Sequence, residues 1–495
     1  MIGSLLPRTT RASTALLRSM RLALPVSIAL ASDSLSAQSL TARDSMLVGR
    51  VLLAEDRRDA ADPVLREAAA HSDVRLRTLA QRAVGRISDP KFVRRDSLPA
   101  LPAAPLWPEP AWRLRFRGLT AKRDDCNALR TAVADSAWPV RFRAAQVVRA
   151  SCSSDMALRD VFVGWLRALP RDASRRTSGA VSWQAAAQGL LALARVWPAD
   201  GKAAVVGAAA NPQWQMRQYA ARAAALVSDT VTLRRLAADR DDNVAETAIE
   251  ALAKLTAHAD DALYVAAIER RGAQVVRAAA TALKGSPRAD VAAAAMRVFE
   301  RFVARANASE RDARVALLAA AGRPASEDKP PMPAVVLPAD AVALALGADV
   351  RLRVTMSKTS GGGTFDVKLR GDNAPLMAAR ILALVKQRYY NGLTWHRVEH
   401  DFVIQGGSPG ANEYVGFAEF LRDELGVVSH RRGTLGMSTR GHDTGDAQWF
   451  VNLRDNARLD PDYTVWAEVV AGIDVVDGVL EGDTIERIEV LAGGR

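Results

Sequence analysis

The chain has 495 residues, of which 49% are hydrophobic and 25% are charged, and it carries a formal net charge of +12. This length exceeds what a single hydrophobic core supports, so we expect several domains, and the apolar share excludes general disorder. The positive charge comes mostly from dispersed arginines that are not interleaved with aromatic residues, so we expect no nucleic-acid partner.

The amino end, residues 1–37, has the order of a secretory signal peptide. Four arginines between Arg8 and Arg21 precede the apolar run 22–31, and small residues follow through Ala37. This run is too short to cross a bilayer, and the rest of the chain contains no apolar run long enough to do so. We therefore predict an exported protein without a transmembrane segment. We expect it in the bacterial periplasm. A buried amphipathic first helix is the alternative interpretation.

Residues 38–325 carry a weak internal repeat, in which a Val or Met, usually followed by Arg, opens an alanine-rich helix. Val74 and Val140 lie 66 residues apart, or two units of 33, and Val244 and Val276 lie 32 apart. Apolar positions follow at helical spacing, so each unit can bury one stripe against its neighbour. We therefore expect an all-α array over this region.

The repeat resembles HEAT-type α-solenoid units, whose spacing is often irregular. The tryptophan, Leu-Gly and tyrosine pattern of tetratricopeptide repeats is missing, and an ordinary helical bundle is the alternative. A solenoid forms an extended curved surface, so the resemblance implies a scaffold for a protein partner or client that the sequence does not identify. A proline-rich insert at about 99–112 interrupts the array.

The chain has two cysteines, Cys126 and Cys152. In an oxidising compartment such a pair on neighbouring helices is a candidate disulfide, and two buried thiols are the alternative. Two thiols without clustered histidines do not make a metal site, so we expect no metal.

A polar, proline-rich linker at 326–339 separates the helical region from residues 340–495. Beyond it the apolar period changes from helical to strand-like, and three glycines at 361–363 suit a hairpin turn. A helix is predicted from Pro375 to about Tyr389, because Asp372 or Asn373 can cap it and proline is tolerated in its first turn.

Two segments of this last region carry the chemistry. The first brings Arg397 and, eight residues later, Gln405, with Phe402 between them. The second alternates apolar and polar positions around Gln448 and Phe450, as a half-buried strand does. An arginine provides a planar fork of donors that stays charged at any ordinary pH, so it can hold a carbonyl oxygen without a proton transfer.

These segments, in this order, resemble the cyclophilin-type peptidyl-prolyl isomerases, and the resemblance runs from about Val350 to Val490. It implies a closed, eight-stranded antiparallel β-barrel capped by two helices. It also implies an enzyme without a cofactor that accelerates rotation about X-Pro bonds in proline-containing polypeptides. We expect this activity to assist the folding of exported proteins.

The resemblance assigns the site residue by residue. Arg397 takes the catalytic role, and His396 beside it is expected to be structural. The substrate-binding positions are Phe402, Val403, Gln405, Ser438, Thr439, Gln448, Phe450, Leu459 and Tyr463. Two positions depart from the common pattern: Arg458 replaces a large apolar side chain, and Thr439 replaces asparagine. They keep open the alternative of a non-catalytic module that binds proline peptides on a HEAT-type scaffold.

Overall fold

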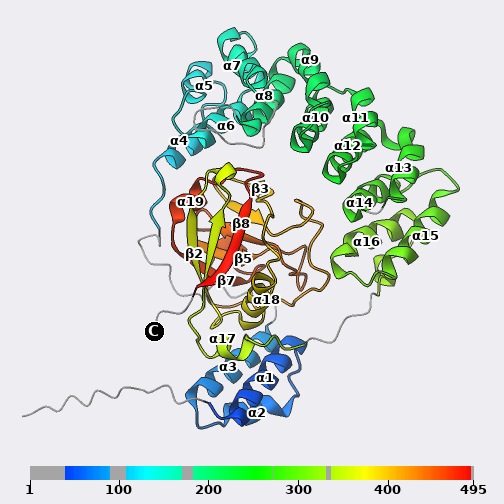
Figure 1. The fold of residues 1–495 in the computed structure, drawn as a ribbon. Helices are drawn as coiled ribbons and strands as arrows, with labels where there is room; N and C mark the ends of the chain where they lie inside the picture. The colour runs from blue at the N-terminus through cyan, green and yellow to red at the C-terminus, as the bar shows by residue number, and fades with distance from the viewer. Residues whose placement is uncertain (1–39, 90–106, 170–181, 271, 330–335, 492–495) are drawn as a thin grey trace, which may run out of the picture.

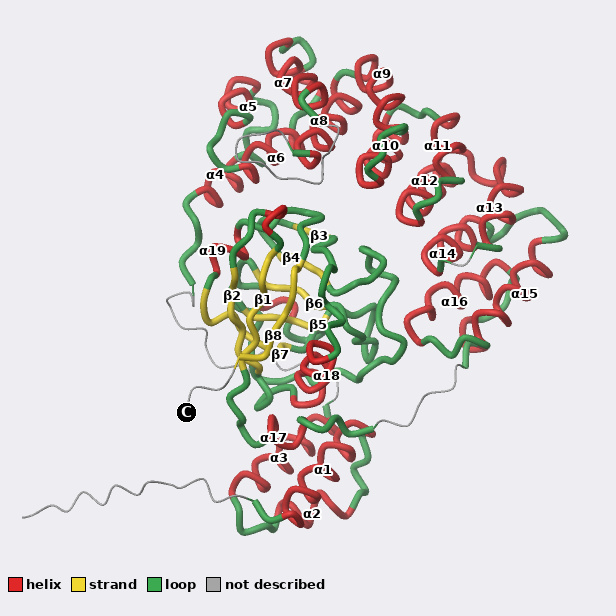
Figure 2. The backbone as a smooth tube through the Cα atoms, in the orientation of Figure 1, coloured by secondary structure: helices red, strands yellow, loops and turns green. Residues whose placement is uncertain are grey.

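The computed structural model describes residues 40–89, 107–169, 182–270, 272–329 and 336–491. The predicted signal peptide therefore lies outside the described residues, as do most of the proline-rich insert and positions 330–335 of the linker. Figures 1 and 2 show a curved sheet at the centre, a helical arch around one side of it and a small helical group below it. No helix among the described residues is both long and apolar enough to cross a membrane.

The small group consists of α1 (Ala42–Arg57), α2 (Pro63–Ala69) and α3 (Val74–Ser88). The side chains of Thr41, Asp62 and Asp73 cap the three helices by accepting backbone N–H bonds. Buried residues of all three helices belong to the same hydrophobic core as the sheet and the short helix α17 (Ala341–Ala345). The structure thus joins α1–α3 to the C-terminal domain, although the sequence repeat grouped them with the other helices.

The arch contains the helices α4 to α16. They are α4 (Trp112–Gly118), α5 (Cys126–Ala132), α6 (Trp138–Val147), α7 (Met156–Arg167), α8 (Trp183–Val196), α9 (Pro198–Ala208), α10 (Trp214–Leu226), α11 (Thr230–Ala237), α12 (Asp242–Thr256), α13 (Asp261–Ile268), α14 (Ala273–Ala282), α15 (Val291–Val303) and α16 (Arg311–Ala320). From α6 to α16 each even-numbered helix packs on the next even-numbered one, and these helices line the concave side (Figure 1). The assignment of this two-layered array to the HEAT family stays a prediction.

The repeat anchors are buried in the arch but not in the small group. Val140, Val244 and Val276 are at most 1% exposed, whereas Val74 is 60% exposed at the start of α3. Val74 is therefore not equivalent to the other anchors, and the apparent spacing of two units between Val74 and Val140 is a coincidence of sequence. Cys126 and Cys152 form a disulfide that links the start of α5 to the turn before α7.

The C-terminal sheet is antiparallel and has eight strands in the order β3-β4-β6-β5-β7-β2-β1-β8. The strands are β1 (Arg351–Met356), β2 (Thr364–Leu369), β3 (Arg397–Val398), β4 (Val403–Gly406), β5 (Thr434–Met437), β6 (Trp449–Asn452), β7 (Val465–Ala471) and β8 (Ile485–Leu491). Helices α18 (Pro375–Lys386) and α19 (Ile473–Asp477) pack on it. The predicted helix from Pro375 thus ends at Lys386, three residues earlier than expected.

The sheet curls but does not close, so the prediction of a closed barrel is wrong. β3 and β8 are its two edges and do not form a ladder with each other. β3 has two residues, which is too short to pair along β8. Instead, the backbone N–H of Trp395 donates to Asp483 O at 2.9 Å, and that of Gly482 donates to Trp395 O at 2.8 Å.

A buried ion pair holds the small helical group against the sheet domain. Arg86 on α3 donates to Glu55 on α1 at 2.6 Å, and its guanidinium also donates to the backbone carbonyl oxygens of Asn373, Glu424 and Leu425. Both side chains are about as buried as the surrounding core. Burial alone would raise the pKa of Glu55, but Arg86 and Arg82 hold that pKa below its usual value. The carboxylate therefore stays charged because its cation is present.

Replacing Arg86 should destabilise the whole protein. We expect Arg86→Ala to lower the free energy of unfolding by about 3–5 kcal/mol, because it leaves a buried carboxylate and carbonyl oxygens without donors. Urea denaturation measures this. Arg50→Ala is the control, because the Arg50–Glu67 pair is exposed and should change stability by about 1 kcal/mol or less. Equal effects of the two substitutions would contradict this account.

Candidate active site

A pocket of about 160 Å³ opens on the sheet beside β3, β4 and β6. It is lined by Arg397, Phe402, Val403, Gln405, Glu413, Ser438, Thr439, Arg440, Gln448, Phe450, Leu459 and Tyr463. All ten residues that the sequence predicts for the site are in this set, so the structure brings them together around one cavity. Glu413 and Arg440 are the two that the sequence analysis missed.

Arg397 lies on the edge strand β3 and pairs in register with Gln405 on β4. Its guanidinium donates to Gln405 Oε1 at 3.3 Å, and the Gln405 amide donates to Ser438 Oγ at 2.9 Å and to Gln448 Oε1 at 3.4 Å. Gln405 and Gln448 are buried, whereas the Arg397 side chain remains 40% exposed. The guanidinium is thus held by the neutral amide of Gln405, and Gln448 acts on it only through that amide.

The pocket floor is a separate small apolar cluster. Val403, Phe450 and Leu459 are buried in it, and Phe402 and Tyr463 pack against them. Phe450 lies over Gly436 of the neighbouring strand, where an added Cβ would come within 2.2 Å of the ring, so only glycine fits there. The cluster forms an apolar recess that can accept one small ring, with the Arg397 guanidinium at its edge.

His430 supports the floor from behind. Its imidazole stacks on Phe450 with ring centroids 5.7 Å apart, and its Nδ1 lies 2.9 Å from Asp460 Oδ1. Burial lowers the pKa of His430 although Asp460 opposes the shift, so the ring is neutral at pH 7. A neutral ring suits packing against phenylalanine and leaves the floor uncharged.

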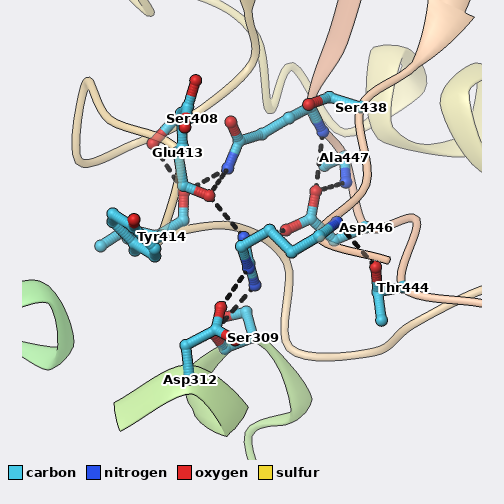
Figure 3. Close-up of polar contacts among 12 residues, drawn as sticks. Ser309, Asp312, Ser408, Glu413, Tyr414, Ser438, Thr444, Asp446 and Ala447 are labelled. Atoms are coloured by element: carbon cyan, nitrogen blue, oxygen red, sulfur yellow. Dashed lines mark hydrogen bonds and ion pairs between the residues drawn. The ribbon is translucent and has the colours of Figure 1, made fainter. Parts of the chain in front are cut away.

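The residues that the sequence missed connect the pocket to the arch. Glu413 Oε1 lies 3.5 Å from the Arg397 guanidinium. Arg440 forms an ion pair with Asp312 of α16 at 2.6 Å, and donates to Ser309 O at 3.0 Å and to Glu413 O at 2.5 Å. Figure 3 shows Ser309 and Asp312 of the arch facing the segments of the sheet domain that carry Glu413 and Asp446. The ion pair of Arg440 with Asp312 connects the sheet domain to α16. No local pattern could reveal it, because the partners are distant in sequence.

Asp446 lies in the segment between β5 and β6, which also contains Arg440, and it fixes the end of this segment that leads into β6 (Figure 3). Its carboxylate accepts the backbone N–H groups of Ala447 and Gln448, at 2.5 and 2.9 Å. Gln448 in turn donates to the backbone oxygens of Glu413 and Val415, at 3.2 Å each. These contacts fix the position of Gln448, which accepts from the Gln405 amide. Among the described residues, no three His, Cys, Asp or Glu side chains are grouped to hold a metal ion.

The sequence comparisons agree with this geometry. The family described as "Cyclophilin type peptidyl-prolyl cis-trans isomerase/CLD" matches residues 353–491. A peptidyl-prolyl cis-trans isomerase of Helicobacter pylori is 33% identical over 130 residues, which are 26% of this chain and 80% of the relative. Peptidyl-prolyl cis-trans isomerase 10 of Caenorhabditis elegans is 31% identical over 133 residues, which are 26% of this chain and 81% of that relative. The chain belongs to the cyclophilin-type peptidyl-prolyl cis-trans isomerases.

The chain is therefore an enzyme of this class, and the predicted resemblance is confirmed. A crystal structure of a cyclophilin type isomerase of Cryptosporidium parvum is 20% identical, with a TM-score of 0.28, and covers 30% of this chain and all of that one. The matched residues all lie in the C-terminal domain, which we call the isomerase domain. The helical arch lies outside the family match.

Arg458 gives this cyclophilin pocket a second cation. Its guanidinium lies 4.6 Å from the ring centroid of Phe402, and that of Arg397 lies 6.0 Å from the same centroid. Phe402 is thus flanked by two cations, each attracted to the ring face. Thr439 lines the pocket together with Ser438 but makes no side-chain hydrogen bond to Arg397 or Gln405 that would replace the missing asparagine.

His396 does not line the proline pocket, which agrees with its predicted structural role. Both of its ring nitrogens are shielded from solvent and have no hydrogen-bond partner among the described residues. Burial, with a smaller contribution from the Arg397 charge, lowers the pKa of His396 to about 4 from its usual 6.5. The ring is neutral in the folded protein at pH 7.

His396 should make stability depend on pH. At a pH below 6.5, His396 binds a proton in the unfolded chain, whereas in the folded chain it does so only near pH 4. The free energy of unfolding therefore falls as the pH drops from 6.5 to about 4. We expect the urea midpoint of the wild type to fall more than that of His396→Gln between about pH 7.5 and about pH 4.5. Parallel pH profiles for the two proteins would contradict this expectation.

Proposed function

We propose that the pocket around Arg397 accelerates rotation about X-Pro bonds in polypeptide substrates. The supporting observation is the partly exposed Arg397 guanidinium, held by Gln405 at the rim of an apolar recess. The proline ring fits against Val403, Phe450 and Leu459, while Arg397 reaches the polar amide that precedes it. The amide side chain of Gln448 and the hydroxyl of Ser438 support this arrangement from the neighbouring strands.

The chemistry requires no covalent step. Amide resonance sets a rotation barrier of about 18–20 kcal/mol. In the twisted state the proline nitrogen loses conjugation and regains a lone pair, to which a preorganised guanidinium can donate. The site must therefore bind the twisted amide more tightly than either planar form, and each tenfold gain in rate takes about 1.4 kcal/mol of such difference.

The alternative is a non-catalytic module that binds proline peptides. Arg458 and Thr439 are its motivation, since they alter the rim where the extended peptide runs. The hydrogen-bonded set of Arg397, Gln405 and Gln448 favours the enzyme, because it preorganises a donor that can stabilise the twisted amide.

Removing the guanidinium tests the two functions against each other. We expect Arg397→Ala in the full chain to lower the isomerisation rate of an Ala-Pro peptide by about 100-fold, because one preorganised donor is lost. Exchange NMR of the peptide measures the rate. Arg351→Ala is the control, since Arg351 is an exposed residue that pairs with Asp349 on the far part of the sheet. A wild-type chain that leaves the exchange rate unchanged would favour the binding module.

We further propose that the protein assists folding of exported proteins, with the arch as a scaffold for clients or partners. The arginine-flanked apolar run within residues 1–37 supports export, and the Cys126–Cys152 disulfide suits an oxidising compartment such as the periplasm. The curved array of α4–α16 beside the pocket supports the scaffold role (Figure 1).

Cleavage of the amino end tests export. When the full sequence is expressed in a bacterium, we expect the mature protein to start near Gln38, because small residues precede that position. Mass spectrometry of the purified protein measures its first residue, and fractionation of the cells gives its compartment. A protein that retains residues 1–37 and stays in the cytoplasm would contradict the proposal.

A further inference from the structure

A second cavity, of about 510 Å³, lies between the concave side of the arch and the isomerase domain. The isomerase domain contributes residues 396–399, 411–414 and Glu481 to it, and the arch contributes side chains from α6, α8, α10, α12 and α14. Arg397 and Glu413 line this cavity and the proline pocket alike. The two spaces are therefore neighbours that share the proposed catalytic cation.

The arch presents a row of neutral polar side chains to this cavity. Gln146 on α6, Gln188 on α8, Gln218 on α10 and Thr247 on α12 all line it. They lie on successive even-numbered helices, which form the concave layer (Figure 1). A glutamine amide carries both donors and an acceptor, so it can pair with both polar groups of a peptide backbone. Gln218 donates to Thr247 at 3.2 Å, and the side chains of Gln146 and Gln188 have no hydrogen-bond partner among the described residues.

Three arginines (Arg222, Arg277 and Arg397) and five glutamates (Glu246, Glu250, Glu399, Glu413 and Glu481) line the cavity, so carboxyl groups outnumber cations and only some of them are paired. Arg277 pairs with Glu246 at 2.6 Å and also with Glu250, and Arg397 pairs with Glu413 at 3.5 Å. Burial raises the pKa of Glu246 to about 7. The excess of carboxyl groups disfavours an anion, and the neutral amides suit an uncharged polar ligand such as a polypeptide backbone.

Contacts on both sides of the cavity hold the arch in place. On one side, Asn243 of α12 donates to Gly410 O at 3.0 Å and accepts from Asn412 at 3.1 Å. On the other, Glu481 accepts from Tyr219 at 2.6 Å, and its backbone oxygen accepts from Gln184 at 2.8 Å. The walls are thus fixed before a ligand arrives, which reduces the entropy cost of binding.

We propose that this cavity binds the extended polypeptide next to the isomerised proline, and that Gln146, Gln188 and Gln218 hydrogen-bond to its backbone. The inference rests on the proposed function, because it places one substrate polypeptide in both the proline pocket and the second cavity. It makes the arch part of the substrate site and makes long, unfolded segments better substrates than short peptides.

Binding and catalysis by the full chain, measured separately, test this. The probes are a neutral, unstructured peptide of about 20 residues with one central Ala-Pro, which spans roughly 70 Å when extended, and a tetrapeptide with the same Ala-Pro. Fluorescence anisotropy gives the dissociation constants, and exchange NMR gives the isomerisation rates. The variants are the triple replacement of Gln146, Gln188 and Gln218 by Ala, and Gln146→Trp, which fills the cavity from an exposed position.

We expect the triple variant to bind the long peptide at least about tenfold more weakly than the wild type, because up to three net hydrogen bonds are lost. The ratio of its affinities for long and short peptides should fall by the same factor, and Gln146→Trp should lower that ratio too. Lys202→Ala, on the outer helix α9, is the matched control and should leave the ratio unchanged.

Equal affinity of the wild type and both variants for the long peptide would overturn the inference, and so would a wild type that binds both peptides equally. Loss of affinity for both peptides in proportion would also overturn it, because the effect would then lie in the shared proline pocket. If the amides matter for binding but the wild type does not accelerate exchange, the proposed isomerase function fails and the binding cavity stands.

Discussion

The site depends on one buried amide, that of Gln405. It is 3% exposed, and it accepts from Arg397 while it donates to Ser438 and Gln448. A buried amide with unsatisfied groups costs free energy, so these partners fix one another. Through this amide the two-residue strand β3 is tied to β4, β5 and β6, and the Arg397 guanidinium has one preferred position above the recess. The apolar residues Val403, Phe450 and Leu459 then favour an apolar group of the ligand beside this cation.

Arginine also explains how the parts of the chain are held together. Arg113 of α4 is fully buried and donates to His400 O, Leu453 O and Asp477. Arg432 of the isomerase domain donates to Pro108 O at the start of the arch, and Arg440 reaches α16 at its other end. A rigid planar fork with five donors can satisfy several carbonyl oxygens in fixed directions, whereas a lysine has three donors on a single nitrogen. These three arginines therefore serve packing between parts of the protein, and each of them also pairs with a carboxylate.

The pocket residues were predictable because they lie on or next to short strands whose motifs resemble those of the cyclophilin type. Val403 and Gln405 lie two residues apart on β4, and Gln448 comes just before β6, which carries Phe450; antiparallel register then places Gln405 opposite Phe450. Glu413 and Arg440 could not be predicted in this way. Their positions depend on contacts with Asn243, Ser309 and Asp312, which are all more than 100 residues away from Glu413 and from Arg440 in the chain. The split of the helical region was equally hidden, because helices α1–α3 and the arch have similar amphipathic patterns.

The sequence by itself determined the family, the antiparallel class of the isomerase domain, the helical class of the preceding region and the residues of the proline pocket. The helical and strand classes follow from hydrophobic periodicity, and the family and the pocket residues follow from the resemblance of short motifs to the cyclophilin type; both signals are local. Only the tertiary structure decided that the sheet stays open, that α1–α3 share its core and that the arch faces Arg397 across a second cavity. Those outcomes depend on which apolar surfaces pack together and which arginines bond to residues that are distant in the sequence. Local sequence patterns do not predict such long-range contacts.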